Sequence, residues 1–465
     1  MSLKLKATTG SRRKRRLRNN QFENQAMVNS RTQQFLSAFE RFQQKSATTP
    51  EWLKDLRRTA IDSFVQLGLP TTRHEDWRYT SVEPIASTNF VAANGEAKLL
   101  RAEDLYGPSF TDPAYNRIVF VNGVFCPQFS SIRELPAGVQ AKNLSAVLTA
   151  NDSPLEPHLT QNSVSREQPF IALNTAFAAE GAFISIPKGL ALDEPIYLVF
   201  CSFGSGNPVM SHPRNLIVFE AGSQARIVEA YIGLGDQPTL TNVVTEVVGG
   251  AGSVIDHYRL QNESSSGYLI AALEADVGRD CSFTAHSVTL NGALIRNDIH
   301  VLLNGEGSEC VLNGLYLPFD KQHVDNHTEI EHAKPRATSQ ELYKGILSGA
   351  AHAVFNGKIL VHKDAQKTDA RQTNKNLLLS EHAVVNTKPQ LEIHADDVKC
   401  SHGSTIGQLD KDALFYLRSR GLDRAEAQSL LSYAFASDLV GRVRIAPLRA
   451  RLDDYMLTKF KRSQS

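Results

Sequence analysis

The sequence predicts a mainly β protein built around a β-solenoid, with helices at both ends. Three observations support this prediction. Runs rich in Val, Ile and Tyr fill the middle of the chain, pairs of a small and an apolar residue recur there about every 29 residues, and helical periodicity is confined to the two ends. A β-sandwich is the competing interpretation, but its strands recur every 8 to 12 residues without a longer repeat.

The composition limits what the chain can recognise. Its 465 residues carry a formal charge of +1, so no overall charge attracts nucleic acid or a membrane surface. The five cysteines are scattered singly, which favours free thiols in a reducing cytoplasm. The sequence also offers neither an apolar run of about 20 residues nor a signal-peptide core. We therefore expect a soluble cytoplasmic protein that binds neither nucleic acid nor membranes.

Changes in pattern divide the chain into four segments. Residues 1–26 are strongly basic and are expected to be a disordered tail, either a tag or an upstream start before Met27. Residues 27–180 are expected to form a mixed, mostly helical region, residues 181–409 the solenoid, and residues 410–465 a helical hairpin with a basic third segment to Lys461.

Local signals specify several elements of the N-terminal region. Two amphipathic helices are predicted between Met27 and Leu69, followed by a polar loop with an aromatic anchor, PTTRHEDWRYTSVEPI. Asn122-Gly123 between apolar alternations predicts a hairpin. Residues 169–183 are typical of another helix, which we expect to stop at Gly181.

The repeat consists of a small residue followed two positions later by an apolar one. One interval between these pairs is 43 residues long, and we expect it to hold an insertion or an irregular coil. The pairs are Ala225 and Ile227, Ser253 and Ile255, Cys281 and Phe283, Cys310 and Leu312, Ala353 and Phe355, and Ala383 and Val385.

The C-terminal helices carry more apolar surface than one solenoid end needs. Asp410 is the expected N-cap of the first helix and Gly421 its C-terminal stop, while Asp423 and Glu426 predict a capping box. Simple capping of the solenoid and a docking platform for another protein are both open. The candidate docking residues are Asp410, Leu414, Phe415, Leu417, Leu430, Tyr433 and Phe435.

A cysteine and a histidine stand close together in LEIHADDVKCSHGSTIGQLD. Alternation places Leu391, Ile393 and Ala395 inward, and a one-residue change of phase, which we attribute to a β-bulge, then turns Cys400 and His402 inward. The thiol either packs as a small apolar group or, with His402, supplies two ligands of a metal site that a partner completes.

Two further polar motifs fall within the repeat. In HVDNHTEIEH the residues His323, Asp325, His327, Glu329 and Glu331 share one strand face, either as a metal-ligand row or as a solvent-facing strip. The stretch VHKDAQKTDARQTNKNLLLS is expected to form hydrogen-bonded ladders along stacked coils or a polar contact surface. No phosphate-binding G-x-x-x-x-G-K-[ST] loop, G-x-S-x-G or H-E-x-x-H motif occurs, so catalysis by this chain is not expected.

Three ordered stretches resemble the SufB/SufD family of the SUF iron–sulfur cluster assembly system. They are RHEDWRYTSVEPI, then LYKGILSG with AVFNGKILVHKDAQKTDARQTNKNLLLS, and TKPQLEIHADDVKCSHGSTIGQLDKDALFYLRSRG. The resemblance covers about residues 30 to 440 and implies a right-handed parallel β-helix. It also implies a partner of the SufB type at the end of the β-helix and docking of the SufC ATPase on residues 410–439.

The resemblance also implies where a cluster would bind. Cys400 falls in the family motif C-S-H-G, and some members place a cluster-forming histidine two positions after His362, where this chain has Asp364. Cys400, His402, His362 and Asp364 are therefore the candidate metal ligands, shared with SufB. No cofactor is expected to bind this chain firmly by itself. At the level of the complex we expect an iron–sulfur cluster and ATP with Mg²⁺ on SufC, with reduced flavin as a further candidate.

These observations lead to the hypothesis of a non-catalytic scaffold subunit of a SufB–SufC–SufD complex. An autonomous cluster scaffold is the alternative function. Whether the isolated chain pairs with itself as a homodimer is left open. A β-helix carbohydrate-active enzyme is a more distant rival, because such an enzyme needs a groove with paired acids and aromatic platforms, whereas the repeat region holds only scattered Tyr and Phe.

Overall fold

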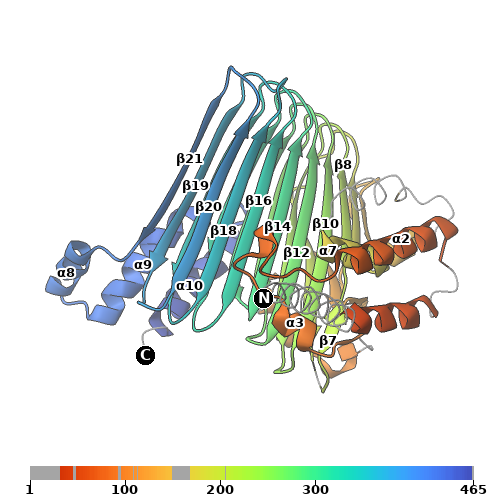
Figure 1. Ribbon diagram of the computed structural model, residues 1–465, viewed down its shortest axis with the longest axis horizontal. Coiled ribbons are helices and arrows are strands. Elements are labelled where there is room, and N and C mark those ends of the chain that lie inside the picture. The colour runs from red at the N-terminus through yellow and green to blue at the C-terminus, as the bar shows by residue number, and fades with distance from the viewer. Residues whose placement is uncertain are drawn as a thin grey trace, which may run out of the picture.

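The computed structural model is a parallel β-solenoid of about seven turns, with helices at both ends, as predicted (Figure 1). It describes residues 32–44, 49–92, 96–107, 109–112, 114–148, 155, 168–204 and 206–462. The predicted basic tail, residues 1–26, lies outside this described part. Among the helices of the described residues, none is long and apolar enough to cross a bilayer.

Two sheets form the walls of the solenoid, and successive coils contribute one parallel strand to each. In order along the chain, the first sheet contains β4 (Gln140–Asn143), β5 (Ala182–Ile186), β8 (Arg214–Phe219), β10 (Thr239–Gly249), β12 (Gly267–Val277), β14 (Leu294–Leu303), β16 (His323–His332), β18 (His352–Val361) and β20 (Val384–Ile393). The short strands β1 (Val91–Ala92) and β7 (Val209–Ser211) extend it.

The second sheet runs alongside the first and ends at the same end of the solenoid. Its strands are β2 (Asn116–Val121), β3 (Val124–Phe125), β6 (Ile196–Phe203), β9 (Gln224–Leu234), β11 (Val254–Asn262), β13 (Ser282–Asn291), β15 (Glu309–Tyr316), β17 (Thr338–Leu347), β19 (Asp369–Leu378) and β21 (Lys399–Gly407). Because β2 and β4 pair with β6 and β5, residues of the predicted N-terminal region also build the sheets.

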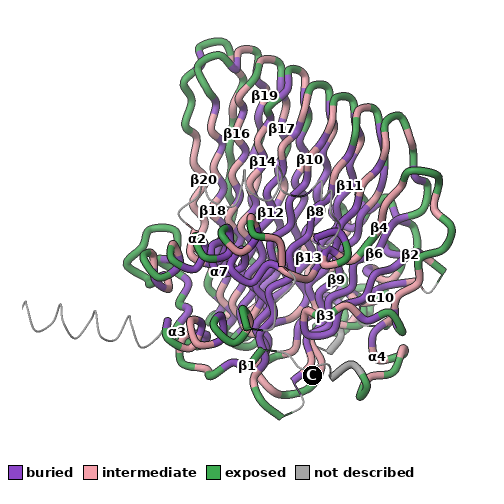
Figure 2. Tube along the Cα trace, turned by 90° about the vertical axis from the view of Figure 1, so that its right-hand side faces the viewer, coloured by how far each residue is buried: buried purple, intermediate pink, exposed green. Residues whose placement is uncertain are grey.

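Registered pairing stacks inward-facing residues into columns along the interior. One column of the second sheet shows how the repeat works, since its members are mainly small or apolar and mostly buried. It consists of Ala225, Ile255, Phe283, Cys310, Ser339, Ala370 and Cys400. Figure 2 shows the resulting buried interior and the greater exposure of the last coils.

The predicted insertion in the 43-residue interval is wrong. Ser339 continues the column after Cys310, and β16 is a regular strand in the middle of the interval. Ala353, which ends the interval, lies in the first sheet, where it pairs with Val385. The long interval arises because the small–apolar pattern occurs in both strands of a coil, and the periodic pairs change from one sheet to the other.

Small hydroxyl side chains close one corner of successive coils. Ser223, Ser253, Ser308 and Thr368 each donate a hydrogen bond to the carbonyl three residues earlier, at 2.7 to 2.9 Å. These bonds satisfy carbonyl groups that leave the sheet at the turn, which would otherwise be costly to bury. The same hydrogen bond therefore stabilises the turn before a strand of the second sheet in four of the coils.

Position 314 in β15 has room only for a glycine, because the Tyr343 ring of the next coil lies against it. A Cβ atom at this position would lie 2.1 Å from the Tyr343 ring, which is itself buried. We expect Gly314→Ala to lower the free energy of unfolding by about 1 to 3 kcal/mol, because the ring has no free space to move into. Urea denaturation checks this. Gly403→Ala is the matched control, since no described atom lies within 4 Å of a Cβ added there, and an equal loss in both variants would contradict the explanation.

The N-terminal helices pack against the start of the first sheet. They are residues 32–44 and α2 (Glu51–Leu67), as predicted, and they contact α7 (Pro169–Ala176). The shorter elements of this region are η1 (Glu75–Trp77), α3 (Glu83–Ser87), η2 (Glu96–Leu99), α4 (Ala102–Tyr106) and α5 (Leu144–Leu148).

Two local predictions in this region have different outcomes. The Asn122-Gly123 hairpin is confirmed, with positive φ at both residues between the antiparallel β2 and β3. The predicted helix end at Gly181 is wrong, because α7 ends at Ala176. The carbonyl of Ala178 accepts two hydrogen bonds from Arg57 instead of continuing the helix, and Gly181 lies against the backbone of Arg214.

Three helices follow the last strand. They are α8 (Lys411–Ser419), α9 (Arg424–Val440) and α10 (Ala446–Arg462). Asp410 accepts hydrogen bonds from the backbone of Asp412 and Ala413, and Asp423 with Glu426 forms the predicted capping box. The helices α9 and α10 cover the outer face of the second sheet, where Leu439, Leu448 and Met456 are buried.

Candidate functional site at the open end of the solenoid

The solenoid ends on two uncovered strands, β20 and β21. Within the described part of the chain, neither strand pairs with a further one on its outer side, so a row of backbone groups remains unpaired along each edge. Val384, Ile393 and Ile406 on these strands are 49, 40 and 49% exposed. Monomeric proteins rarely leave both unpaired strand edges and apolar side chains exposed to solvent in one place.

The inward direction of Cys400 and His402 is confirmed by the register. Cys400 pairs with Ala370 and His402 with Gln372, both of which face the interior. The predicted β-bulge is wrong. The change of phase occurs because the turn 394–398 connects two strands of different sheets. The inward residues have odd numbers on β20 and even numbers on β21, because the two strands belong to different sheets.

Cys400 is half-buried and packs against a small apolar cluster that includes Leu391 and Val398. Burial raises the pKa of the Cys400 thiol, and the negative charge of Asp369 raises it further. The thiol is therefore protonated at neutral pH until a metal displaces the proton. His402, two residues later in the sequence, is the next residue on the same inward face, and it is exposed.

His362 and Asp364 lie in the turn after β18, not on the inward face with Cys400. His362 Nε2 is 2.6 Å from Glu331 Oε1, and Asp364 is exposed. The next coil stacks on this turn through a hydrogen bond from the Asp397 amide to Gln366. Among the described residues, no group of three or more His, Cys, Asp and Glu side chains could hold a metal ion. The structure therefore does not bring the four candidate ligands together into one closed site.

The polar row of β16 is covered by the N-terminal strap, which we define as residues 70–80. Trp77 of the strap is buried and stacks on the Arg296 guanidinium at 3.8 Å, as its predicted role of anchor requires. Arg296 in turn lies 2.6 Å from Asp325, and Thr80 donates a hydrogen bond of 2.5 Å to the same carboxylate. The row is thus largely an ion-pair network under the strap rather than a solvent-facing strip.

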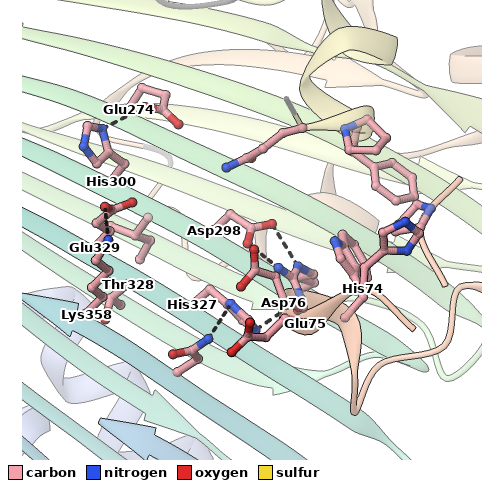
Figure 3. A pocket seen from close by; sticks show the side chains of 18 of the residues that line it. His74, Glu75, Asp76, Glu274, Asp298, His300, His327, Thr328, Glu329 and Lys358 are labelled. Carbon is pink, nitrogen blue, oxygen red and sulfur yellow. Dashed lines mark hydrogen bonds and ion pairs between the residues drawn. The ribbon is translucent and has the colours of Figure 1, made fainter. Parts of the chain in front are cut away.

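A cleft of about 560 Å³ remains between the strap and the first sheet (Figure 3). Several of its charged side chains are paired with one another: His300 lies 3.0 Å from Glu274, and Lys358 lies 3.4 Å from Glu329. Burial raises the pKa of Asp325, but Arg296 and His327 outweigh it and hold the pKa well below its usual range. These residues stabilise the attachment of the strap.

The predicted ladders of residues 361–380 are present in the interior. Asn374 donates to the Tyr316 hydroxyl at 3.0 Å, Tyr316 donates to Asn376 at 2.5 Å, and Gln372 donates to Glu341 at 2.7 Å. Burial raises the pKa of Glu341 to about 7. The hydrogen-bonded ladders are therefore confirmed. The outward residues of the same strand, including Arg371 and Lys375, are exposed, and their use as a polar contact surface stays a prediction.

The candidate docking residues of the C-terminus divide into two groups. None of the nine residues of α8, all of which the structure describes, is buried, and Phe415 is 73% exposed. Leu414 and Leu417 are partly exposed, and Leu430 of α9 is 44% exposed. Tyr433 and Phe435 instead support the fold, through a hydrogen bond to Asp453 and a contact with Lys344.

Sequence reasoning overlooked Tyr416, which is 56% exposed beside Phe415. The available signal was two adjacent aromatic residues on a short helix, since at most one of them can face a neighbouring surface. It also overlooked the cations that attach α9 and α10 to the second sheet. Lys344 pairs with Asp438, Arg444 pairs with Asp256, and Lys459 donates to the carbonyl groups of Leu290 and Leu317.

Known proteins are similar in sequence to nearly the whole chain. Residues 202–435 match the model of the SUF system FeS cluster assembly SufBD core domain, and residues 29–198 match that of the SufBD protein N-terminal region. A Synechocystis protein named as an iron–sulfur cluster assembly SufBD family protein is 34% identical over 417 residues, 88% of this chain and 91% of its own length.

Two relatives carry the name iron–sulfur cluster assembly protein SufD. The Escherichia coli protein is 33% identical over 84% of this chain and 89% of its own length. The Bacillus subtilis protein is 25% identical over 92% of this chain and 98% of its own length. With both family models matched in order, the chain belongs to the SufBD family and has a role in SUF iron–sulfur cluster assembly.

Proposed function

We propose that this chain is the non-catalytic scaffold subunit of a cytoplasmic SufB–SufC–SufD complex. The observation that carries the proposal is the pair of uncovered surfaces at one end of the molecule, the edges of β20 and β21 and the helix α8. A protein that worked alone would be expected to cover such edges with its own chain. In this proposal ATP and Mg²⁺ bind to SufC, which fits the absence of a phosphate-binding loop motif from this sequence.

The edges of β20 and β21 are the proposed contact with SufB. A second parallel solenoid with the same rung spacing can pair its own end with these strands, so that backbone hydrogen bonds continue across the junction. The exposed side chains Val384, Ile393 and Ile406 would then be buried. Self-pairing of the isolated chain through the same edges is the competing occupancy, which SufB would displace.

The cluster is the cargo of this junction. Cys400 and His402 offer one sulfur and one nitrogen ligand at the open mouth, and His362 with Asp364 offers further donors at the adjacent turn. Because these donors do not close a site, SufB supplies the remaining ligands. Reduced flavin, if the assembled complex uses it, would belong to the complex rather than to a pocket of this chain.

SufC is proposed to dock on α8. Phe415 and Tyr416 present a large aromatic surface that this chain leaves uncovered, and such residues dominate the energetics of protein interfaces. The helices α9 and α10 hold α8 beside the end of the solenoid, because Lys344, Arg444 and Lys459 attach them to the second sheet. Movement of SufC would thus be transmitted to the junction with SufB.

Replacing Phe415 and Tyr416 together by alanine is expected to weaken binding of purified SufC by about 10- to 100-fold, since a central aromatic anchor typically contributes at least 2 kcal/mol. Isothermal titration calorimetry measures the loss. Leu457→Ala on α10 is the matched control, because Leu457 is also an exposed apolar residue, at 42%, but lies outside α8. Unchanged affinity in the double variant would exclude α8 as the docking site.

An autonomous cluster scaffold is the second candidate, and the placement of Cys400 and His402 on one inward face favours it. Anaerobic reconstitution of the isolated chain separates the two candidates. The scaffold-subunit proposal expects no stable visible chromophore without SufB. A chromophore that forms in the isolated chain and disappears in Cys400→Ala would establish autonomy.

A further inference from the structure

Gln372 lies directly beneath His402 in the interior of the solenoid. The two residues are paired in register on β19 and β21, so their Cα atoms are one strand spacing, about 4.8 Å, apart and their side chains leave the sheet on the same side. Gln372 is 2% exposed, whereas His402 stands at the open mouth. The side chain of Gln372 therefore lies on the buried side of His402, where it can contact the imidazole ring.

The rest of the interior is built to hold the amide of Gln372 in place. Its Nε2 donates a hydrogen bond of 2.7 Å to Glu341 Oε2 on the coil below. On the facing wall, a Cβ at position 357 would lie 2.1 Å from the same nitrogen, so Gly357 leaves the space that the amide fills. These two contacts orient the Nε2 and thereby determine the direction of the amide oxygen.

That oxygen has no hydrogen-bond partner. Gln372 Oε1 is buried and accepts no bond from any residue that the structure describes. Leaving a buried acceptor unsatisfied typically costs about 1 to 3 kcal/mol, so native structures rarely retain one without use. His402 is in register with Gln372 on the adjacent strand, and an imidazole ring carries an N–H group that can donate a hydrogen bond.

We propose that Gln372 is the positioning residue of His402: its Oε1 accepts the N–H of one ring nitrogen and leaves the other nitrogen directed outward as a ligand. Histidines that bind metals typically donate their second nitrogen to such an acceptor, which fixes both the tautomer and the ring orientation. The inference rests on the proposed ligand role of His402, and it assigns Glu341 and Gly357 to the support of that ligand.

The test measures the tautomer of His402 by ¹⁵N NMR of the histidine-labelled full chain, with His402→Ala to identify its signal. Wild type is expected to hold the proton on a single ring nitrogen. Gln372→Met, which keeps the volume but removes the acceptor, is expected to give a mixture of tautomers. Glu341→Gln is the conservative variant and should preserve the wild-type signal, because an amide oxygen at position 341 can still accept from Gln372.

The matched control is Thr373→Val, on the same strand but on its outer face. An identical tautomer population in wild type and Gln372→Met would overturn the inference. So would an equal effect of Thr373→Val, because the change would then report a general disturbance of β19. If Gln372→Met does not fold, Glu341→Leu serves in its place, because it removes only the group that orients the amide, and an unchanged tautomer there also overturns the inference.

A second readout concerns metal binding by the full chain together with SufB, with Co²⁺ as the spectroscopic probe. Loss of the acceptor is expected to weaken Co²⁺ binding by about 10- to 100-fold, with Glu341→Gln close to wild type. Equal affinity in Gln372→Met overturns the positioning role. The proposed function fails separately: if His402→Ala leaves Co²⁺ binding intact while the tautomer still depends on Gln372, the hydrogen bond stands and the ligand role of His402 falls.

Discussion

Replacing Arg259 by methionine is expected to lower the free energy of unfolding by about 3 to 5 kcal/mol, because the change leaves a buried carboxylate without its cation. Arg259 and Glu229 are 2 and 0% exposed in the interior of the solenoid. Arg259 Nε donates to Glu229 Oε2 at 3.0 Å, and the hydroxyl groups of Tyr231 and Thr245 donate to the same carboxylate. Urea denaturation at neutral pH measures the loss.

The charge state of Glu229 decides the size of this effect. Burial raises the pKa of Glu229, but Arg259 and His257 outweigh burial, and the pKa lies far below its usual range. The carboxylate is therefore ionised at neutral pH. Without Arg259 it would be a buried, unpaired charge unless it takes up a proton. In the Arg259→Met variant we accordingly expect stability to recover partly as the pH falls.

Two controls separate the buried charge from simple packing. Arg371→Met removes an exposed arginine that pairs with Asp369, and it should change stability by less than about 0.5 kcal/mol. The double variant Glu229→Leu with Arg259→Met removes both charges and should regain most of the loss. A double variant as unstable as Arg259→Met alone would show that shape, not charge, explains the effect.

Glu263→Gln is expected to stabilise the protein above pH 8 by about 4 to 5 kcal/mol, because each pH unit between the pKa of a free carboxyl group and that of the buried one is worth about 1.4 kcal/mol. Glu263 is 1% exposed, and burial raises its pKa to about 8, with the nearby Ser264 amide and Ser202 hydroxyl offsetting only part of the shift. Gly233 and Gly267 give the carboxyl group its space, since a Cβ at either position would approach Glu263 Oε2 within 3.0 Å.

The sign follows from the raised pKa of Glu263. The folded protein holds this proton up to about pH 8, whereas the unfolded chain releases it near pH 4.5. The associated stability is complete below about pH 4.5 and is lost as the pH rises to 8. Glu341, whose burial raises its pKa to about 7, acts in the same direction. These two carboxyl groups therefore make the fold less stable at pH 8.5 than at pH 5.5. Burial lowers the pKa of His212, His286, His323 and His332, which act in the opposite direction, so only the difference between Glu263→Gln and wild type isolates Glu263.

Urea denaturation at a series of pH values checks the role of Glu263. The glutamine variant should gain stability relative to wild type as the pH rises from 5.5 to 8.5, because an amide does not titrate. Glu309→Gln, an exposed position on β15, is the control and should retain the wild-type dependence. An unchanged pH dependence in Glu263→Gln would mean that the carboxyl group gains solvent or a partner when it ionises.

The open end shows where sequence patterns suffice and where they do not. Alternation was enough to place Cys400 and His402 on one inward face, because the side-chain period of a strand is two and is local. It could not distinguish a β-bulge from a turn between two walls, because both shift the phase by one residue. The pattern of small and apolar residues also occurs in both walls, and its change from one wall to the other made the regular strand β16 look like part of an insertion.

The candidate ligands illustrate the limit further. His362 and Asp364 are close to one another in sequence, but whether they share a site with Cys400 depends on how the turns of successive coils stack. The burial of Asp325 under Trp77 and Thr80 was likewise hidden, because the strap and β16 lie more than two hundred residues apart. Long-range contacts of this kind leave no periodic signal.

By itself, the sequence determined the solenoid class, the helices at both ends, the N-caps of the C-terminal helices and the inward face of Cys400 and His402, because all of these depend on short-range periodicity and on which residues can cap the backbone. The tertiary structure alone decided which strands belong to which wall, that α8 stays uncovered while α9 and α10 are attached, and that Gln372 lies beneath His402. These features depend on the register between coils, and register is set by packing across the interior rather than along the chain.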